Sequence, residues 1–192
     1  MNNMITAKEI FSTMNSGGTK IPAGFHENVK FTGITPGATF FDIGFEKDGK
    51  VHNKRVYAPS GPVKTREGED ELAAIKRDRN NRLQHLLKMM RIFMGQDAID
   101  QFEAPDYNSF VERGADMLNR LKDSKTVNLK LIYDKERRYS SFGFFPDYVE
   151  EHVLGETHTL KYSKYELEKE LNKPAGTAST TLADSKPKDL MV

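Results

Sequence analysis

The sequence predicts a mostly β, mixed α+β domain in which two helices interrupt a set of five strands. Apolar and polar residues alternate over residues 41–46, which is typical of a strand with one buried face. Between residues 66 and 94 the apolar spacing changes to three, four and seven, which is typical of an amphipathic helix. Strict alternation then returns at residue 126. A chain of 192 residues is long enough for one such domain with an appendage.

Three strands are predicted ahead of the helices. The first begins at Phe25, alternates as far as Thr32, and ends at the Pro36-Gly37 turn. The second and third, over residues 41–46 and 51–57, form a hairpin. The Asp48-Gly49 pair between them supplies the positive φ angles of a tight turn.

Two helices are predicted next. The first spans residues 66–94, and Gly95 is placed to end it. The second spans residues 107–122, and Asp106 is placed to cap its first turn. The apolar stripe of the first helix consists of Leu72, Ile75, Leu83, Leu86, Leu87, Met90, Phe93 and Met94.

The last two strands are predicted over residues 126–133 and 138–145, with a turn at 134–137. Residues 146–150 are expected to end the sheet and to open a short helical turn. Five short strands with helices between the third and fourth are the layout of an OB-like β-barrel.

The domain is therefore expected to cover residues 21–155, after an N-terminal segment 1–20, with its helical insertion at about 66–122. Residues 156–172 form a charged extension that is expected to be helical near its end. Residues 173–192 contain two prolines, many small polar residues and no aromatic residue, so we expect this tail to be disordered.

Charge is segregated along the chain although the formal net charge is only +1. Residues 47–91 carry twelve Lys or Arg and six Asp or Glu, a local charge of +6. Residues 92–118 carry one basic and six acidic residues, a local charge of −5. Such segregation indicates either a directional field or ordinary solvated faces.

Aromatic and basic residues adjoin on the predicted strands, which is the combination that binds unpaired nucleic acid. Aromatic rings stack on bases for about 1–3 kcal/mol each. Lys and Arg neutralise phosphates without reading sequence. Filling of the core is the alternative role of each ring. The candidate contact residues are Lys30, Lys54, Arg55, Tyr57, Lys130, Arg137, Arg138, Tyr139 and Phe142.

Three segments resemble phage-type single-stranded-DNA-binding proteins of the OB-fold class. They are IPAGFHENVKFTGITPG, DIGFEKDGK and LKLIYDKERRYSSFGFFPDYVEE, and the resemblance in layout spans residues 21–151. It implies sequence-tolerant binding of single-stranded DNA in replication or recombination, with replication or recombination proteins as partners. The family often has an acidic C-terminal tail, whereas residues 173–192 contain three lysines and two aspartates.

Composition argues against several other classes. The absence of cysteine excludes disulfides, thiolate zinc sites and cysteine nucleophiles. The five histidines lack metal-ligand spacing, so we expect no metal, no cofactor and no enzymatic activity. No run of about 18 apolar residues and no signal-like start is present, so we expect a cytoplasmic protein with no membrane partner. In a phage this would be the host cytoplasm, and homo-oligomers are compatible with the sequence.

Two alternatives remain open. One is a virion structural or adaptor protein whose apolar helical stripe docks on a partner. The other is a metal-dependent nuclease, in which Asp106 and Asp123 hold a divalent ion and Lys125 orients the attacking water.

Overall fold

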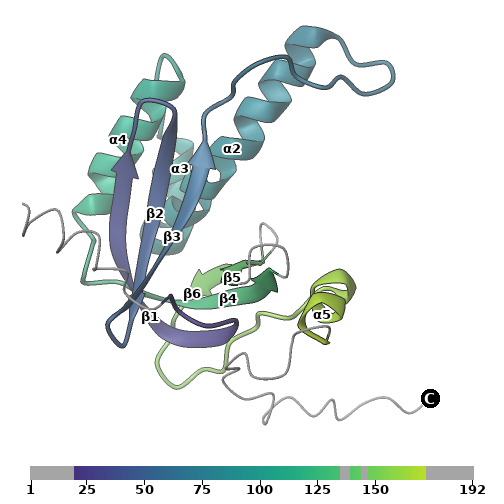
Figure 1. Cartoon of the computed structure of the whole chain (residues 1–192). Helices are drawn as coiled ribbons and strands as arrows, with labels where there is room; N and C mark the ends of the chain where they lie inside the picture. The colour runs from purple at the N-terminus through teal and green to yellow at the C-terminus, as the bar shows by residue number, and fades with distance from the viewer. Residues whose placement is uncertain (1–19, 135–138, 144–146, 172–192) are drawn as a thin grey trace, which may run out of the picture.

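The computed structural model describes residues 20–134, 139–143 and 147–171, which form a mixed α+β structure with an antiparallel sheet (Figure 1). The strands are β1 (Gly24–Pro36), β2 (Phe40–Lys47), β3 (Lys50–Tyr57), β4 (Thr126–Asp134), β5 (Tyr139–Phe142) and β6 (Val149–Glu151). The helices are α2 (Glu71–Met94), α3 (Gln96–Asp100), α4 (Tyr107–Asn119) and α5 (Lys164–Leu171). The predicted mixed class, with helices between the third and fourth strands, is confirmed. The predicted disordered tail lies outside the described residues.

The strands follow the order β3-β2-β1-β4-β5, and β6 pairs with β4. β1 belongs to two parts of the sheet, because its first half pairs with β4 and its second half with β2. In Figure 1, β4 and β5 cross the base of the three long strands β1, β2 and β3. No ladder joins β3 to β5 within the described part of the chain, so the sheet is open between these two strands.

β1 bends at two irregular points, one in the part that pairs with β4 and one in the part that pairs with β2. Its register against β4 shifts between His26 and Val29, and its register against β2 shifts between Phe31 and Gly33. Extra residues of this kind bend a strand and increase its twist. Gly33 has a φ of 115°, and a Cβ atom there would lie 2.6 Å from the side-chain oxygen of Asn119. Glycine is therefore required at the second bend.

The side chain of Asn119 takes the place of a neighbouring strand at this bend. Its Oδ1 accepts a hydrogen bond of 2.7 Å from the Ile34 N–H, and its Nδ2 donates one of 2.9 Å to the Ile34 carbonyl. Both backbone groups of a buried residue are thus satisfied by the end of α4. Asn119 ties α4 to the middle of β1.

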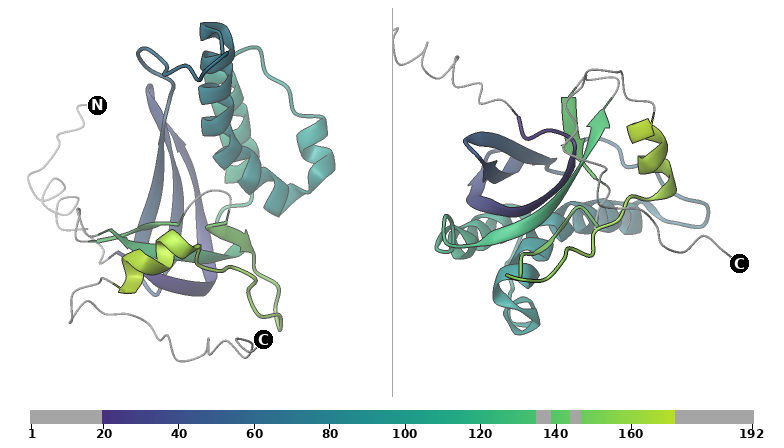
Figure 2. Two further views of the ribbon diagram at one scale, coloured as in Figure 1. Left: turned by 90° about the vertical axis from the view of Figure 1, so that its right-hand side faces the viewer. Right: turned by 90° about the horizontal axis from the view of Figure 1, so that it is seen from below.

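The core lies between the inner face of the sheet and the helices α2 and α4, which lie together on one side of β1–β3 (Figure 2). Phe41, Ile43 and Phe45 are completely buried, as their alternation predicts. The rings of Phe31 in β1 and Phe93 in α2 lie with their centroids 5.0 Å apart. Sheet and helices therefore share one hydrophobic core.

The first helix differs from the prediction at its N-terminal end. It begins at Glu71 and not at Arg66, because the Asp70 side chain accepts a hydrogen bond from the Ala73 N–H and caps the first turn. Leu72 and Ile75 of the predicted apolar stripe are exposed, Leu72 by 79%. Only the later turns pack on the sheet. Gly95 ends the helix with a φ of 83°, as expected.

Two further elements differ from the sequence-based expectations. Residues 149–151 form β6, paired with β4, and do not open a helical turn. The short helix α3 was not expected. α5 lies inside the segment expected to be helical, and it is fixed to β4 by an ion pair between Lys130 Nζ and Glu166 Oε2 at 2.9 Å. Neither side chain of that pair is more than 2% exposed.

None of the helices in the described ranges combines the length and the apolarity that crossing a membrane requires.

Three histidines, His26, His52 and His85, lie in or beside the core, and burial lowers the pKa of each. The shift is large for His52 and His85. The His52 ring is perpendicular to the Phe142 ring, with centroids 4.8 Å apart. His85 Nδ1 lies 3.2 Å from the Tyr148 hydroxyl. Burial lowers the pKa of both imidazoles from 6.5 to about 4, and the positive charges of Lys20 near His52 and Lys54 near His85 add to this.

Acid is therefore expected to destabilise the protein between pH 6.5 and pH 4. In this range the unfolded chain binds protons at His52 and His85 that the folded protein does not bind. As the pH is lowered through this range, the free energy of unfolding decreases by up to about 1.4 kcal/mol per pH unit for each histidine. Well above pH 6.5 both histidines are neutral in both states, so they no longer make the stability depend on pH. Urea unfolding from pH 4 to pH 8 measures the effect, and an unchanged acid limb in His85→Gln would contradict it.

Candidate nucleic-acid interface

β3 divides the predicted contact residues between its two faces. Tyr57 and Arg55 lie on the outer face, and Tyr57 is 57% exposed. Lys54 lies on the inner face, because successive side chains of a strand point in opposite directions. Its ammonium lies 5.5 Å from the ring centroid of Phe142 and 5.7 Å from that of Tyr148. Burial lowers the pKa of Lys54. Lys54 and Tyr57 therefore do not form one surface.

On the outer face, Tyr57 and Arg55 meet two residues of β2. The Arg55 guanidinium donates two hydrogen bonds, of 2.9 and 2.7 Å, to the two carboxylate oxygens of Asp42. It also lies 3.9 Å from the ring centroid of Phe40, and Phe40 contacts Tyr57 edge-on at 6.4 Å. The hydrogen bonds that Arg55 donates to Asp42 raise the pKa of Arg55. We call these four residues the outer cluster.

Three other predicted contact residues make interactions within the protein. Lys130 is buried and donates to both Glu166 and the Lys161 carbonyl. Phe142 is buried against Phe45 and Tyr148. Lys30 Nζ lies 3.1 Å from a carboxylate oxygen of Asp123 and 3.7 Å from one of Glu46, and the hydrogen bond that it donates to Asp123 raises the pKa of Lys30. We remove Lys130 and Phe142 from the candidate site, because each is part of the interior.

Arg137 and Arg138 lie outside the described residues. Tyr139 opens β5, where its backbone pairs with Asp134, and its side chain is outside the description. These three expectations stay predictions.

A cavity of about 610 Å³ adjoins Tyr57, and we call it the Tyr57 cavity. It lies at the end of β3, between the β1–β2 turn and the helices α2 and α4, at the upper end of the molecule in Figure 1. A second cavity, of about 290 Å³, shares Ala38, Tyr107 and Asn108 with it and reaches Phe40. The Tyr57 cavity is lined by Ala38, Thr39, Tyr57, Ala58, Pro59, Ser60, Ile75, Arg79, Tyr107 and Asn108.

Backbone contacts hold the walls of the Tyr57 cavity in place. Arg82 of α2 donates a hydrogen bond of 2.9 Å from Nη1 to the Tyr57 carbonyl and forms an ion pair with Asp78. The Ala58 N–H donates one of 2.8 Å to the Thr39 carbonyl. The end of β3 is thus fixed to both α2 and the β1–β2 turn.

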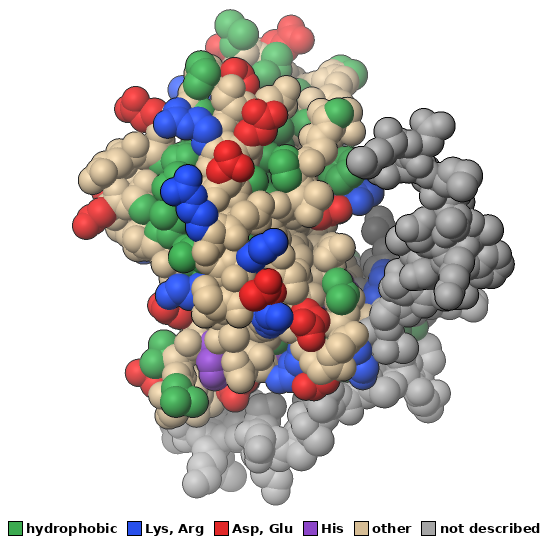
Figure 3. Space-filling view, turned by 90° about the vertical axis from the view of Figure 1, so that its left-hand side faces the viewer, with side chains coloured by type: hydrophobic (Ala, Val, Ile, Leu, Met, Phe, Trp, Pro, Cys, Tyr) green, Lys and Arg blue, Asp and Glu red, His purple; other side chains and the backbone are tan. Residues whose placement is uncertain are grey.

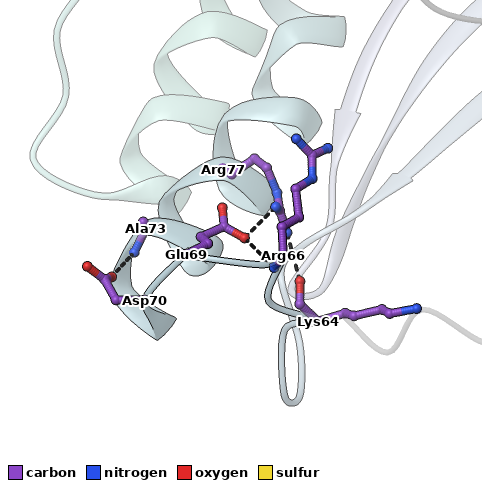
Figure 4. Close-up of polar contacts among 6 residues, drawn as sticks. All are labelled: Lys64, Arg66, Glu69, Asp70, Ala73 and Arg77. Carbon is purple, nitrogen blue, oxygen red and sulfur yellow. Dashed lines mark hydrogen bonds and ion pairs between the residues drawn. The ribbon is translucent and has the colours of Figure 1, made fainter.

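The loop after β3 is held by a contact set centred on Glu69, which we call the Glu69 latch (Figure 4). One carboxylate oxygen of Glu69 accepts hydrogen bonds from the Arg66 N–H at 2.9 Å and from Arg77 Nη1 at 2.5 Å. Arg77 Nη2 also donates to the Lys64 carbonyl at 2.8 Å. The latch ties the loop that carries Pro59 and Ser60 to the first turns of α2.

Three arginines of the basic segment 47–91 are ion-paired in the structure. Arg55, Arg77 and Arg82 each pair with a carboxylate. Figure 3, which shows the face that carries α4 and β1, has basic and acidic side chains interspersed. Arg79 is different, because it forms no ion pair and no hydrogen bond with any residue that the structure describes.

The two acids of the nuclease alternative cannot hold one ion. Asp106 caps the N-terminus of α4 by accepting from the Ser109 N–H, whereas Asp123 follows its C-terminus. The 13 residues of α4 separate the two by about 20 Å, at about 1.5 Å per residue. No group of three acidic or histidine side chains fit to bind a metal occurs among the described residues.

Sequence reasoning missed Phe40, Ile75, Arg79 and Tyr107. Ile75 and Arg79 stand four residues apart on α2, so their shared face could have been read from the sequence. Tyr107 and Phe40 come from other segments, and their proximity depends on the tertiary fold.

Comparison of the chain with models of protein families, with curated proteins and with solved structures found no match.

Proposed function

We propose that this protein binds single-stranded nucleic acid, and DNA in particular, without sequence preference and without catalysing a reaction. The observation that carries the proposal is the exposed ring of Tyr57, which belongs to the outer cluster and also lines the Tyr57 cavity. A large exposed aromatic side chain beside cations is the arrangement that stacks on unpaired bases.

The strand arrangement supports an OB-like barrel that is open between β3 and β5. The rings of His52 in β3 and Phe142 in β5 lie 4.8 Å apart, so side chains of the two terminal strands meet inside the curled sheet. Lys54 of β3 also lies over the Phe142 ring. OB-like barrels bind oligonucleotides on one sheet face and at the neighbouring loops. Here β3 carries Tyr57 and Arg55, and the adjacent helix α2 carries Arg79.

In the proposed complex, bases stack on Tyr57 and phosphates lie against Arg79 and Arg55. Arg55 already lies flat on Phe40, so its planar group is oriented before binding. Its pairing with Asp42 leaves it a weaker phosphate ligand than Arg79. The roles in phage replication or recombination, the cytoplasmic location, protein partners and self-association are part of the same proposal and follow from the resemblance alone.

Tyr57→Ala is expected to weaken binding of a labelled oligothymidylate by about 1–3 kcal/mol, because the stacking surface is lost. Tyr57→Phe should bind almost as well as the original protein, since the base contacts the face of the ring. Fluorescence anisotropy at several salt concentrations measures both effects. Affinity should fall with salt, with a log–log slope of about 0.7 for each phosphate neutralised.

Tyr165→Ala is the matched control, because Tyr165 on α5 is 55% exposed and lies outside the proposed site. Its affinity should equal that of the original protein. Equal affinities for Tyr57→Ala and Tyr165→Ala would remove Tyr57 from the site. No salt-dependent affinity at all would overturn the proposal in favour of an adaptor.

A further inference from the structure

The Tyr57 cavity has the size of a small-molecule site. Its volume of about 610 Å³ lies within the range of about 300–1,000 Å³ that is typical of such sites. Its walls come from four separate segments, and the Glu69 latch and the Arg82 bond to the Tyr57 carbonyl fix two of them. A ligand would therefore enter a preformed space.

The lining favours a flat aromatic ligand. Two tyrosine rings, those of Tyr57 and Tyr107, border the space together with the apolar side chains of Ile75 and Pro59. Aromatic rings and apolar walls of this kind hold planar rings by stacking and by exclusion of water. The polar residues Thr39, Ser60 and Asn108 also line the space, and hydroxyl and amide groups are of the kind that bonds to the polar edge of a base.

Arg79 is the cation at the cavity wall. Arg77 and Arg82, on the neighbouring turns of α2, are each engaged by a carboxylate. Arg79 lines the cavity, is exposed, and is bonded to no other residue in the described ranges. A guanidinium suits a phosphate group because its donors match two phosphate oxygens. A planar ring with an adjacent phosphate is a nucleotide.

We infer that the Tyr57 cavity takes one unpaired nucleobase of the bound strand, with the phosphate of that nucleotide on Arg79. This inference rests on the proposed function and deepens it. Stacking on the outer face of β3 would account for sequence-tolerant contact with several bases. The cavity, in contrast, would hold one base, unstacked from its neighbours in the strand. The protein then holds a single nucleotide as well as a run of nucleotides.

The test compares a mononucleotide with an oligonucleotide on the same variants of the full chain. Ala38→Leu narrows the cavity from the exposed β1–β2 turn without adding an aromatic ring. Arg79→Gln removes the phosphate contact. Arg91→Gln is the matched control, because Arg91 is an exposed arginine in the last turn of the same helix. Binding of thymidine monophosphate is followed by NMR, binding of oligothymidylate by anisotropy, and folding by melting temperature.

We expect thymidine monophosphate to bind saturably to the original protein, whereas deoxyribose 5-phosphate, which lacks the base, binds at least tenfold more weakly. Ala38→Leu and Arg79→Gln should each weaken mononucleotide binding at least tenfold at an unchanged melting temperature, and Arg91→Gln less than twofold. Two separate variants are used so that misfolding of one still leaves the other as a test.

Two outcomes overturn the inference and differ in what they leave standing. If the oligonucleotide binds through Tyr57 but the mononucleotide does not bind, or binds equally to both cavity variants, the cavity holds no base and the proposed function stands. If neither ligand binds the original protein, both proposals fail together.

Discussion

Replacing Glu166 by alanine is expected to destabilise the folded protein by about 3–5 kcal/mol, because it leaves the Lys130 ammonium buried without its counter-charge. Lys130 is 1% exposed and Glu166 is fully buried. The Lys161 carbonyl is the only other hydrogen-bond partner of the Lys130 amine within the described structure. Urea unfolding at pH 7 measures the loss directly as a shift in midpoint.

Two controls distinguish the cost of leaving a buried charge unpaired from the cost of simply losing an ion pair. Asp78→Ala breaks the partly exposed pair with Arg82 within α2, and should cost only about 0.3–0.5 kcal/mol. Replacing both Lys130 and Glu166 by methionine should cost less than Glu166→Ala alone, since no charge then remains buried. A Glu166→Ala loss no larger than the Asp78→Ala loss would show that solvent or another group reaches Lys130.

Asn119→Leu is expected to have the second largest effect on stability. Leucine has a similar volume but leaves the Ile34 N–H and carbonyl without their partners, at about 1–3 kcal/mol for each group. Unfolding in urea, with circular dichroism as the probe, gives the difference in free energy. The helix contact with β1 should also loosen, so amide hydrogen exchange at Ile34 should be faster.

Asn119→Asp keeps an acceptor for the Ile34 N–H and loses the donor to the carbonyl, so its stability should lie between those of Asn119→Leu and the original protein. Asn80→Leu, at an exposed position of α2, tests the effect of the leucine itself and should stay within about 0.5 kcal/mol. Equal stability of Asn119→Leu and Asn80→Leu would contradict the role assigned to the amide.

The elements that could be predicted from the sequence are those stabilised by neighbours along the chain. The β2–β3 hairpin follows from alternation and from the Asp48-Gly49 turn, in which both residues have positive φ angles. The cap at Asp106 and the end of α2 at Gly95 are also local. β6 could not be predicted, because three residues become a strand only by pairing with β4.

The same distinction between local and long-range interactions applies to the candidate site. That Lys54 and Arg55 point in opposite directions follows from strand geometry. That Lys130 is buried does not follow, because a lysine on a strand is normally solvated and this one is covered only when Glu166, 36 positions later, packs on it. The Tyr57 cavity has no local signal, since it is built from four separated segments.

The pairing of β1 with both β2 and β4 affects the order in which the chain folds. Its second half can pair with β2 as soon as a short turn closes, whereas its first half pairs Gly24 with Leu131, across the three helices α2, α3 and α4. Bringing Gly24 and Leu131 together closes a long loop and lowers the entropy of the chain before the stabilising contacts have formed. This slows folding. We therefore expect the β1–β2–β3 meander and α2 to assemble first. β4 then pairs with the first half of β1, whose edge stays unpaired until that late step.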